Sequence, residues 1–247
     1  MIYKKLFCIL ILCFGTACSS VDEKFVAASA EGEMEVVMEL ASKVSSIDAR
    51  EDRGWTALIA SASTGRLDVV KFLLAKKPYI NSRTLSGDTA IYKACSNNHF
   101  EIVKLLYENG ASINIKDKFG DTPLMKAASK GNLKILQFLL EKDANPNEIR
   151  LKYIDENTAL IQSIESENLD LVKLLVKYKA DVNHKNHEGE TALSMAAKKG
   201  NYSIVKFLLD NGADKENLST YGLTPLNHAM ENNHTAVMKE LMKGVSK

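Results

Sequence analysis

Residues 120–147 read GDTPLMKAASKGNLKILQFLLEKDANPN, and this stretch predicts two short helices joined by a glycine. Gly120 suits a tight turn that a side chain would hinder, and the hydroxyl of Thr122 can cap the helix that follows. Pro123 takes the first helical position, where its missing N–H costs nothing. Small residues at 127 and 128 favour close packing, and Gly131 ends the helix. Leucine-rich residues up to 140 then give a second helix an apolar face that needs a covering neighbour.

The same pattern recurs along the chain with a period of 33 residues. Threonine occupies positions 56, 89, 122, 158, 191 and 224, in steps of 33, 33, 36, 33 and 33, and glycine stands two residues before five of these six. Asparagine recurs with them at 81, 114, 147 and 183. Self-similarity at a fixed period of this length indicates a solenoid, in which stacked units cover one another's apolar faces.

The repeated unit resembles the ankyrin repeat. The resemblance rests on Gly-Asp-Thr-Pro-Leu at 120–124, on Ala127-Ala128, Gly131-Asn132 and the leucine-rich 136–140, and on closing turns such as Asn-Gly-Ala-Asp at 211–214. It covers about residues 22 to 247 and implies an all-α solenoid of about seven stacked helix-loop-helix repeats with short hairpin loops. It also implies a non-catalytic module that binds other proteins through a concave strip of loop tips and first-helix faces.

The register of the pattern predicts where each repeat begins. The expected units are a degenerate N-terminal capping repeat at 22–52, repeats at 53–85, 86–118, 119–154 (with a three-residue insertion), 155–187 and 188–220, and a C-terminal capping repeat at 221–247. Glu39 and Glu240 stand where the internal repeats carry Phe or Leu. Because terminal repeats need polar outer faces, we expect the solenoid to be complete within this chain.

The fifth repeat, residues 155–187, departs most from the pattern. Three extra residues fall between Asn147 and Thr158, and Glu156 and Glu167 replace the two usual glycines. Ile164 stands where the neighbouring repeats carry Ala or Cys. An atypical unit weakens its interfaces in a one-dimensional array, so we expect repeats one to four and five to seven to open semi-independently.

The first 17 residues have the layout of a secretory signal peptide. Lys4 and Lys5 form a basic start, nine apolar residues run from 6 to 14, and small residues precede Cys18. The apolar segment is about half as long as a membrane-spanning helix requires. The sequence therefore predicts export.

Cys18, followed by two serines, resembles the lipobox of bacterial lipoproteins, although Gly15 stands where most lipoboxes carry Leu. The resemblance implies lipid attachment at Cys18, a short tether over residues 18–24, and anchoring in the bacterial cell envelope. Two alternatives remain open at this point. Ordinary cleavage after Ala17 would give a soluble periplasmic or secreted protein, and an uncleaved segment would act as an anchor.

Composition excludes several classes of protein. The chain has 247 residues, 45% of them hydrophobic, with 32 basic against 31 acidic residues, which argues against disorder and against nucleic-acid binding. No P-loop, G-x-S-x-G or H-E-x-x-H motif occurs, so we expect neither catalytic residues nor a cofactor. His184 and His187 lack a third ligand at a fixed spacing, so we expect no metal site.

Other recurring polar residues have structural interpretations. Lysines at 71, 104, 173, 206 and 239 form a row on the second helices, and neighbouring acidic residues indicate a solvated outer face rather than a membrane or nucleic-acid site. His99 and His234 are expected to cap helix starts and pack, and His228 to pack on the first helix of the last repeat. Cys95, at a position of small residues, is expected to be a buried and unreactive thiol.

Partner contacts are expected beside the turn glycines and after the paired alanines. The selected residues are Arg53, Trp55, Phe119, Lys130, Lys198, Lys199 and Tyr221. Aromatic residues and arginine commonly anchor interfaces, but packing onto the adjacent repeat is the alternative for the three aromatic residues.

The sequence thus predicts a monomeric, envelope-displayed module that binds an unidentified partner protein. The main alternative is a secreted effector or inhibitor that acts on a host or competitor protein. An enzyme, and a structural scaffold that self-associates through its exposed loop tips, are the other two alternatives.

Overall fold

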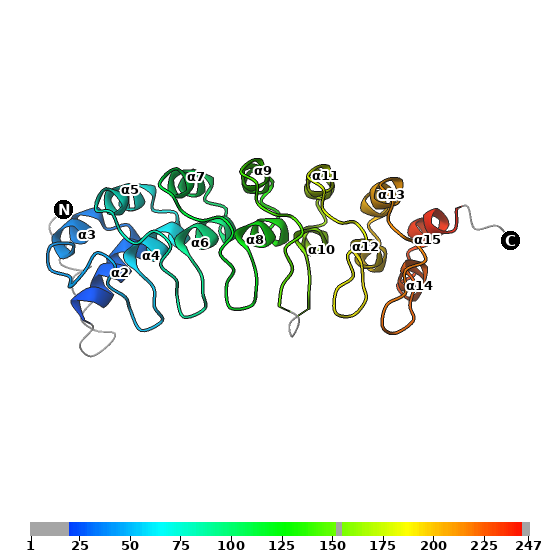
Figure 1. Ribbon diagram of the computed structural model, residues 1–247, viewed down its shortest axis with the longest axis horizontal. Coiled ribbons are helices and arrows are strands. Elements are labelled where there is room, and N and C mark those ends of the chain that lie inside the picture. Colours follow the sequence, from blue (N-terminus) through cyan, green and yellow to red (C-terminus); the bar gives the residue numbers. More distant parts are fainter. Residues whose placement is uncertain (1–19, 152–154, 244–247) are drawn as a thin grey trace, which may run out of the picture.

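Pairs of short helices stack side by side to form an elongated array in the computed structural model, which describes residues 20–151 and 155–243 (Figure 1). The α-helices are α2 (Val21–Glu31), α3 (Met34–Leu40), α4 (Ala57–Thr64), α5 (Leu67–Ala75), α6 (Ala90–Ser96), α7 (Phe100–Glu108), α8 (Pro123–Ser129), α9 (Leu133–Glu141), α10 (Ala159–Ser163), α11 (Leu169–Lys177), α12 (Ala192–Lys199), α13 (Tyr202–Asp210), α14 (Pro225–Glu231) and α15 (Thr235–Leu241). A short 3-10 helix, η1 (Ile164–Ser166), follows α10. The described residues contain no strand, and one isolated β-bridge joins Arg50 to Thr56. The expected all-α solenoid is confirmed.

The helices form two rows. The even-numbered helices, α2 to α14, are the first helices of the pairs. Each packs on the next, so together they form one row. The second helix of each pair packs on its own first helix, and the loops between pairs project as hairpins beyond the first helices (Figure 1). Buried side chains such as Leu58, Leu124 and Leu160, which are at most 2% exposed, fill the space between the rows. One apolar core therefore runs through the stack, as nearest-neighbour repeats require.

Each first helix after α2 begins at one of the six recurring threonines. The Thr side-chain oxygen accepts a hydrogen bond from the backbone N–H three residues further on, at 3.2–3.4 Å in all six helices. This bond satisfies one of the helix's unpaired donors, and losing such a cap costs about 1 kcal/mol. The expected capping role of the threonines is confirmed.

Consecutive hairpins are joined by one backbone hydrogen bond each. The N–H of Leu85 donates to the carbonyl of Arg53 (2.9 Å), and equivalent bonds follow at 118→86 (2.9 Å), 151→119 (3.3 Å), 187→155 (3.0 Å) and 220→188 (2.8 Å). Within a hairpin, a side-chain oxygen accepts from two backbone N–H groups; the acceptors are Glu51, Thr84, Asp117, Asn186 and Ser219. These bonds fix both the shape of each hairpin and its distance from the next.

The hairpin bonds also locate the three extra residues. In the other hairpins, the residue that donates to the preceding hairpin is followed directly by the residue that accepts from the next one. In the fifth repeat's hairpin the donor is Leu151 and the acceptor is Asp155, so three residues separate them. The extra residues are therefore 152–154, which lie outside the described part of the chain. Gly120 is needed here because it has a φ of +85°, and a Cβ would lie 2.7 Å from the backbone nitrogen of Leu151.

His99 and His234 connect neighbouring repeats instead of capping their own helices. Their side chains make no capping bond at the starts of α7 and α15. Instead, Nε2 of His99 lies 3.1 Å from the carbonyl oxygen of Ser63, and Nε2 of His234 lies 3.0 Å from that of Lys198. The expected capping role was wrong because the ring covers the preceding repeat, where a Cβ on Gly65 would lie 2.6 Å from His99.

The two terminal glutamates differ in environment. Glu39 is exposed and lies 2.6 Å from Nζ of Lys43. Glu240 is only 9% exposed and accepts hydrogen bonds from the Tyr202 hydroxyl (2.9 Å) and from Nζ of Lys243 (2.6 Å). The expectation of a polar outer face at Glu240 is therefore wrong, because this carboxylate binds the preceding repeat.

The fifth repeat keeps the helical plan with local changes. Its first helix, α10, ends at Ser163 and tightens into η1, where the fully buried Ile164 replaces the Ala or Cys of the neighbouring repeats. Glu156 (φ +56°) and Glu167 (φ +53°) take the left-handed conformation that glycine or asparagine takes at the same positions of other repeats. A side chain in this conformation costs about 1 kcal/mol or more, so this repeat carries local strain.

The expected tether ends earlier than residue 24. Val21 to Lys24 belong to α2, and Ser20 caps that helix by accepting a hydrogen bond from the N–H of Glu23 at 3.1 Å. The expected signal peptide, residues 1–17, and Cys18 lie outside the described residues. Among the helices that are described, none has the length and apolar character to cross a membrane.

Candidate functional site

The inner surface, by which we mean the hairpin tips and the solvent-facing sides of the first helices, collects the same repeat positions in rows. Two rows dominate it. One is the residue that directly follows each turn residue, such as Asp88 or Asp121, and the other is the residue four positions after each capping threonine, such as Lys93 or Lys126. These rows lie side by side because the hairpins and first helices repeat in register. The side chains of one repeat therefore reach those of the next.

Trp55 is held by residues of the following repeat. The ammonium group of Lys93 lies 5.1 Å from the centroid of the Trp55 ring and 2.7 Å from Oδ2 of Asp88. The Asp88 carboxylate is buried, and the Lys93 side chain is 23% exposed. A cation over an indole ring stabilises the pair electrostatically. Trp55 is half-buried, so it packs onto the adjacent repeat and also presents part of its ring to solvent.

Asp121 is the centre of a second network. This carboxylate is 1% exposed, and it accepts hydrogen bonds from Nζ of Lys126 (2.7 Å) and Nε2 of Gln162 (2.8 Å). Nε of Arg150 forms an ion pair with Oδ1 of Asp121 at 3.0 Å, but its N–H is not aligned for a hydrogen bond. Arg150 also forms an ion pair with Asp155. Because a buried charge requires partners, this network fixes the inner surface between the fourth and fifth repeats.

A buried phenol supports the hairpin that carries Phe119. The Tyr92 hydroxyl donates to Oδ2 of Asp117 at 2.7 Å, and Oδ1 of the same carboxylate accepts from the N–H groups of Phe119 and Asp121. Burial, followed by the neighbouring carboxylate, raises the pKa of Tyr92 far above its usual range. The phenol therefore remains a hydrogen-bond donor to the carboxylate that binds the hairpin backbone.

The C-terminal part of the inner surface is built around Glu190. Its Oε1 lies 3.4 Å from Nε2 of the buried His228 and 4.0 Å from Nζ of Lys198. His228 is 4% exposed, and neither ring nitrogen has a hydrogen-bond partner among the described residues. The Glu190 carboxylate thus faces the next repeat, as Asp121 does in the fourth repeat.

The residues selected from sequence all lie on this surface. Arg53, Phe119, Lys130, Lys198 and Tyr221 are exposed, with Phe119 41% and Tyr221 75% accessible. Nζ of Lys118 lies 5.3 Å from the centre of the Phe119 ring. Lys199 is less available because its side chain is 28% exposed and its Nζ lies 3.1 Å from Glu165.

Sequence reasoning missed the residues that connect these positions. Lys93, Lys126 and Gln162 occupy the row four residues after the threonine, and they form the ion pair and hydrogen bonds described above. The signal was available, since the lysines at 93 and 126 each stand five residues after an acidic residue, Asp88 or Asp121, that follows a turn glycine. The spacing alone could not have shown whether the hydrogen-bond partner of each side chain lies in its own repeat, as for Lys126, or in the preceding one, as for Gln162.

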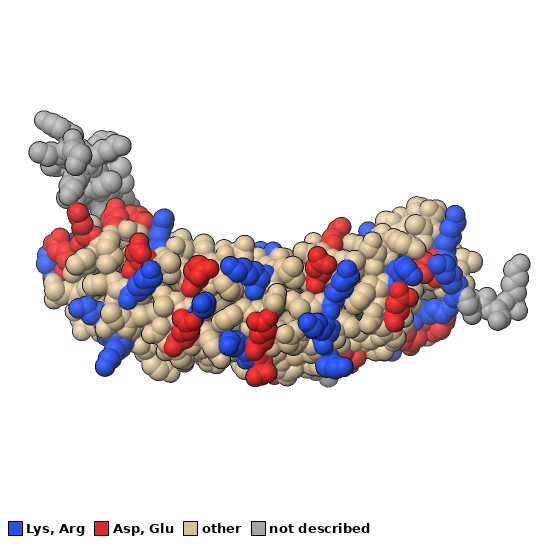
Figure 2. Space-filling view, turned by 90° about the horizontal axis from the view of Figure 1, so that it is seen from above, with Lys and Arg blue, Asp and Glu red and all other residues tan. Residues whose placement is uncertain are grey.

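The outer surface, formed by the second helices, carries both signs of charge interspersed (Figure 2). Four of the five lysines in its row lie 3.5–3.9 Å from a carboxylate on the same helix; the pairs are Lys71–Asp68, Lys104–Glu108, Lys173–Asp170 and Lys206–Asp210. These exposed pairs contribute little to stability. They reduce the net field of the row, which supports its interpretation as a solvated face.

Other candidate chemistry is accounted for by local packing. Cys95 is fully buried, and burial raises the pKa of its thiol well above the usual range, so the reactive thiolate is disfavoured. Nε2 of His184 lies 2.8 Å from the carbonyl oxygen of Glu156. Among the described residues, no group of three or more His, Cys, Asp or Glu side chains is placed to hold a metal ion.

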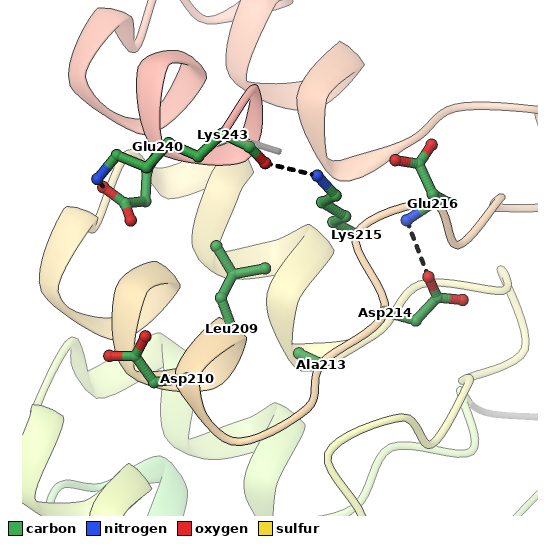
Figure 3. A pocket seen from close by; sticks show the side chains of 8 residues that line it. All are labelled: Leu209, Asp210, Ala213, Asp214, Lys215, Glu216, Glu240 and Lys243. Atoms are coloured by element: carbon green, nitrogen blue, oxygen red, sulfur yellow. Dashed lines mark hydrogen bonds and ion pairs between the residues drawn. The ribbon is translucent and has the colours of Figure 1, made fainter. Parts of the chain in front are cut away.

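An open hollow of about 450 Å³ lies between α13 and α15 (Figure 3). Charged side chains dominate its lining, which is made of four carboxylates, two lysines, Leu209 and Ala213. Glu240 is bound by Lys243, which lowers the pKa of this carboxyl, and Nζ of Lys215 donates to the Lys243 carbonyl at 2.8 Å. The polar groups of the hollow therefore already hold the last repeat in place.

Comparison with known families gives one match. A family model described as ankyrin repeats (3 copies) matches residues 24–117, 80–150, 111–186 and 160–247. These overlapping matches extend over nearly all of the described chain. No curated protein matches the sequence significantly.

Proposed function

This chain belongs to the ankyrin-repeat family, whose members are in general non-catalytic protein-binding modules, and from that premise we propose a place and a surface for its binding. The repeats indicate a module for protein–protein interaction. We propose that the protein is displayed at the bacterial cell envelope and holds its partner against the inner surface. The hairpin tips and first helices would make the contacts.

The observation that carries this proposal is the fixed position of the inner-surface side chains. Lys93 is held at 2.7 Å from Asp88 while it covers Trp55, and Lys126 is held at 2.7 Å from Asp121. A surface whose side chains are already ordered loses little conformational entropy when a partner binds. The outer surface also joins neighbouring repeats, because Nζ of Lys134 lies 3.6 Å from Oε1 of Glu101 and 3.9 Å from the centroid of the Phe100 ring. Both charged side chains of that pair are about two-thirds exposed, however, whereas the carboxylates of Asp88 and Asp121 on the inner surface are buried.

The proposed attachment is a lipid on Cys18. Helix α2 starts at Val21, only three residues after that cysteine, and it packs on α4. Extended backbone spans about 3.5 Å per residue, so a lipid on Cys18 would hold the first repeat close to the membrane surface. The inner surface would then be presented to proteins of the envelope.

Metabolic labelling tests the attachment. We expect a fatty-acid analogue to label the protein, the labelled protein to sediment with membranes, and Cys18→Ser to remove both properties. A matched Cys95→Ser variant should keep the label, because that thiol is buried in the core. An unlabelled protein that is recovered in the soluble fraction would instead support the secreted effector or inhibitor.

Affinity capture from the native envelope tests the binding surface. We expect Trp55→Ala and Phe119→Ala to weaken capture of the partner while lowering the melting temperature by no more than a few degrees. Lys173→Ala on the outer surface serves as the control and should leave capture unchanged. If both aromatic variants captured the same protein as well as the unmodified chain, the inner surface would not be the binding site.

A further inference from the structure

The inner surface carries opposite charges in its two halves. We compare six positions in each repeat. Three lie at the hairpin tip: the two residues before the left-handed turn residue (Gly54 and its equivalents) and the one after it. The other three lie on the first helix, four, seven and eight residues after the capping threonine. Between residues 52 and 130, which we name the N-terminal inner surface, these positions hold basic Arg53, Lys93, Lys118, Lys126 and Lys130 and acidic Asp52, Asp88 and Asp121. Between residues 155 and 232, the C-terminal inner surface, they hold basic Lys198 and Lys199 and acidic Asp155, Glu165, Glu188, Glu190 and Glu231.

Solvent exposure increases this contrast. On the N-terminal inner surface, Asp88 and Asp121 are 6% and 1% exposed, and each is already paired with a lysine at 2.7 Å. Arg53 and Lys130 are exposed and have no carboxylate partner among the described residues. On the C-terminal inner surface, the exposed Glu188 likewise has no cationic partner within the described chain. The charges that reach solvent are therefore mainly positive in one half and mainly negative in the other.

Apolar side chains reach solvent on both halves, since Tyr221 of the C-terminal inner surface is 75% exposed, but in the positive half they stand beside exposed basic residues. Trp55, Leu85 and Phe119 lie on three successive hairpins, and Leu85 and Phe119 are 75% and 41% exposed. The backbone bonds between hairpins hold these residues in a row beside Arg53. Aromatic side chains next to arginine are typical of the residues that contribute most to binding energy.

We propose that the N-terminal inner surface binds an acidic protein segment that also carries apolar side chains. This inference rests on the proposed function and specifies its partner. Carboxylates of the segment would meet Arg53 and Lys130, and its apolar side chains would contact Trp55 and Phe119. The negative C-terminal inner surface would repel the same segment and so restrict it to one half of the stack. Charge complementarity of this kind determines specificity and the rate of association.

Trp55, the only tryptophan, provides the measurement. Two tryptophan-free 12-residue peptides are titrated into the full-length protein: one alternates Glu with Leu and Phe, and the other has Lys in place of every Glu. We expect the acidic peptide to change the Trp55 emission and to bind at least tenfold more tightly than the basic one. Its affinity should fall as salt is added, because exposed charges are screened. Equal or tighter binding of the basic peptide would overturn the proposal.

Charge reversal identifies the residues involved. We expect the double variant Arg53→Glu/Lys130→Glu to bind the acidic peptide at least tenfold more weakly with an unchanged melting temperature, since both side chains are exposed. The matched double variant Lys71→Glu/Lys173→Glu on the outer surface should bind as the unmodified protein does. An unaffected Arg53→Glu/Lys130→Glu variant, or displacement of the peptide by an equally charged RNA oligonucleotide, would contradict a protein segment at this surface.

The same double variant separates this proposal from the broader one. If Arg53→Glu/Lys130→Glu captures the envelope partner as well as the unmodified chain does, the acidic segment is wrong while the binding function stands. If the unmodified chain captures no protein under any condition, the binding function itself fails. Loss of capture in this variant alone supports both proposals.

Discussion

The third repeat (86–118) and the fifth (155–187) follow the same plan with different local means. At its three left-handed positions the third repeat carries Gly87, Asn98 and Gly110, whereas the fifth carries Glu156, Glu167 and Lys179. The first helix of the third repeat is continuous, but that of the fifth shortens to α10 and continues as η1. The fold survives because neighbouring repeats still cover the apolar faces, so packing outweighs local conformational preference.

The connections between repeats differ in the same way. His99 binds the carbonyl of the preceding repeat, whereas Asn168, its counterpart in the fifth repeat, accepts a bond from the N–H of Asp170 in its own helix. At the position where Thr84 accepts two backbone hydrogen bonds within its hairpin, the fifth repeat's hairpin has Arg150, which has no acceptor oxygen in its side chain. In addition, α10 packs less extensively on α12 than the other neighbouring first helices pack on one another. The departures therefore concentrate around one unit, which makes it the expected point of separation.

Core truncations should break the comparison most strongly. Leu124 and Leu160 occupy the same position in the fourth and fifth repeats and are at most 1% exposed. We expect Leu124→Ala and Leu160→Ala each to lower the free energy of unfolding by about 2–5 kcal/mol. Only Leu160→Ala should also separate the unfolding of the two parts, because it truncates α10, the first helix that packs least on the first helix that follows it.

Urea titration followed by two signals measures this separation. Trp55 emission reports the N-terminal part, and far-ultraviolet circular dichroism reports every helix. We expect coincident transitions for Leu124→Ala and distinct ones for Leu160→Ala. A single cooperative transition in both variants, with uniform hydrogen-exchange protection, would argue against semi-independent opening.

Glycine at two of its strained turns should make the fifth repeat more like the fourth, which carries Gly120 and Gly131 at these positions. We expect Glu156→Gly and Glu167→Gly each to raise the free energy of unfolding by about 0.5–1 kcal/mol, because relief of the left-handed strain exceeds the entropy lost with glycine. The reverse change, Gly120→Ala, should be destabilising, since its Cβ would lie 2.7 Å from a backbone nitrogen. Thermal and urea unfolding measure all three variants, and destabilisation by Glu156→Gly would show that strain at that turn is unimportant.

Restoring the missing connection should have a smaller effect. We expect Asn168→His to place an imidazole over Gly131, where there is room because a Cβ on that glycine would meet only Cβ of Ser166, at 3.6 Å. The ring should then bind the carbonyl of Ser129, and one such hydrogen bond contributes about 1 kcal/mol, less the loss of the Asn168 cap. Amide exchange in α10 and α11 should slow, whereas His99→Ala should speed exchange at the preceding interface. Unchanged exchange in Asn168→His would mean that this connection does not limit opening.

The smallest effect concerns an ion pair between the third and fourth repeats. Nζ of Lys116 lies 2.6 Å from Oε2 of Glu148, and this hydrogen bond holds the pKa of Glu148 below its usual value. A lowered carboxyl pKa adds stability above the unfolded-state pKa of about 4.3, and that stability is lost as the pH falls through the folded-state value. Glu148→Gln should therefore be slightly less stable than the unmodified protein at pH 7, with the difference vanishing in acid. Urea midpoints at both pH values measure it, and an equal difference at both would exclude this carboxylate as the cause.

Sequence reasoning succeeded where a rule needs only a few neighbouring residues. A threonine before a helix, as at Thr122, caps it wherever the helix lies, so the recurring threonines determined the period and the helix starts. Turn positions followed from glycine, and the irregular unit followed from Glu156 and Glu167. Local rules also indicated the inner surface, because residues at equal repeat positions must form rows in a stack.

The tertiary structure alone decided which side chains of different repeats meet. Lys93 covers Trp55, Gln162 reaches Asp121, and the imidazole of His99 turns to the preceding repeat rather than to its own helix. The burial of Glu240 belongs to the same class, since its partner Tyr202 lies on another repeat. Periodicity specifies the spacing of such residues, but the direction of each side chain depends on the packing and charge of the repeat beside it. Only the assembled stack brings those neighbours together.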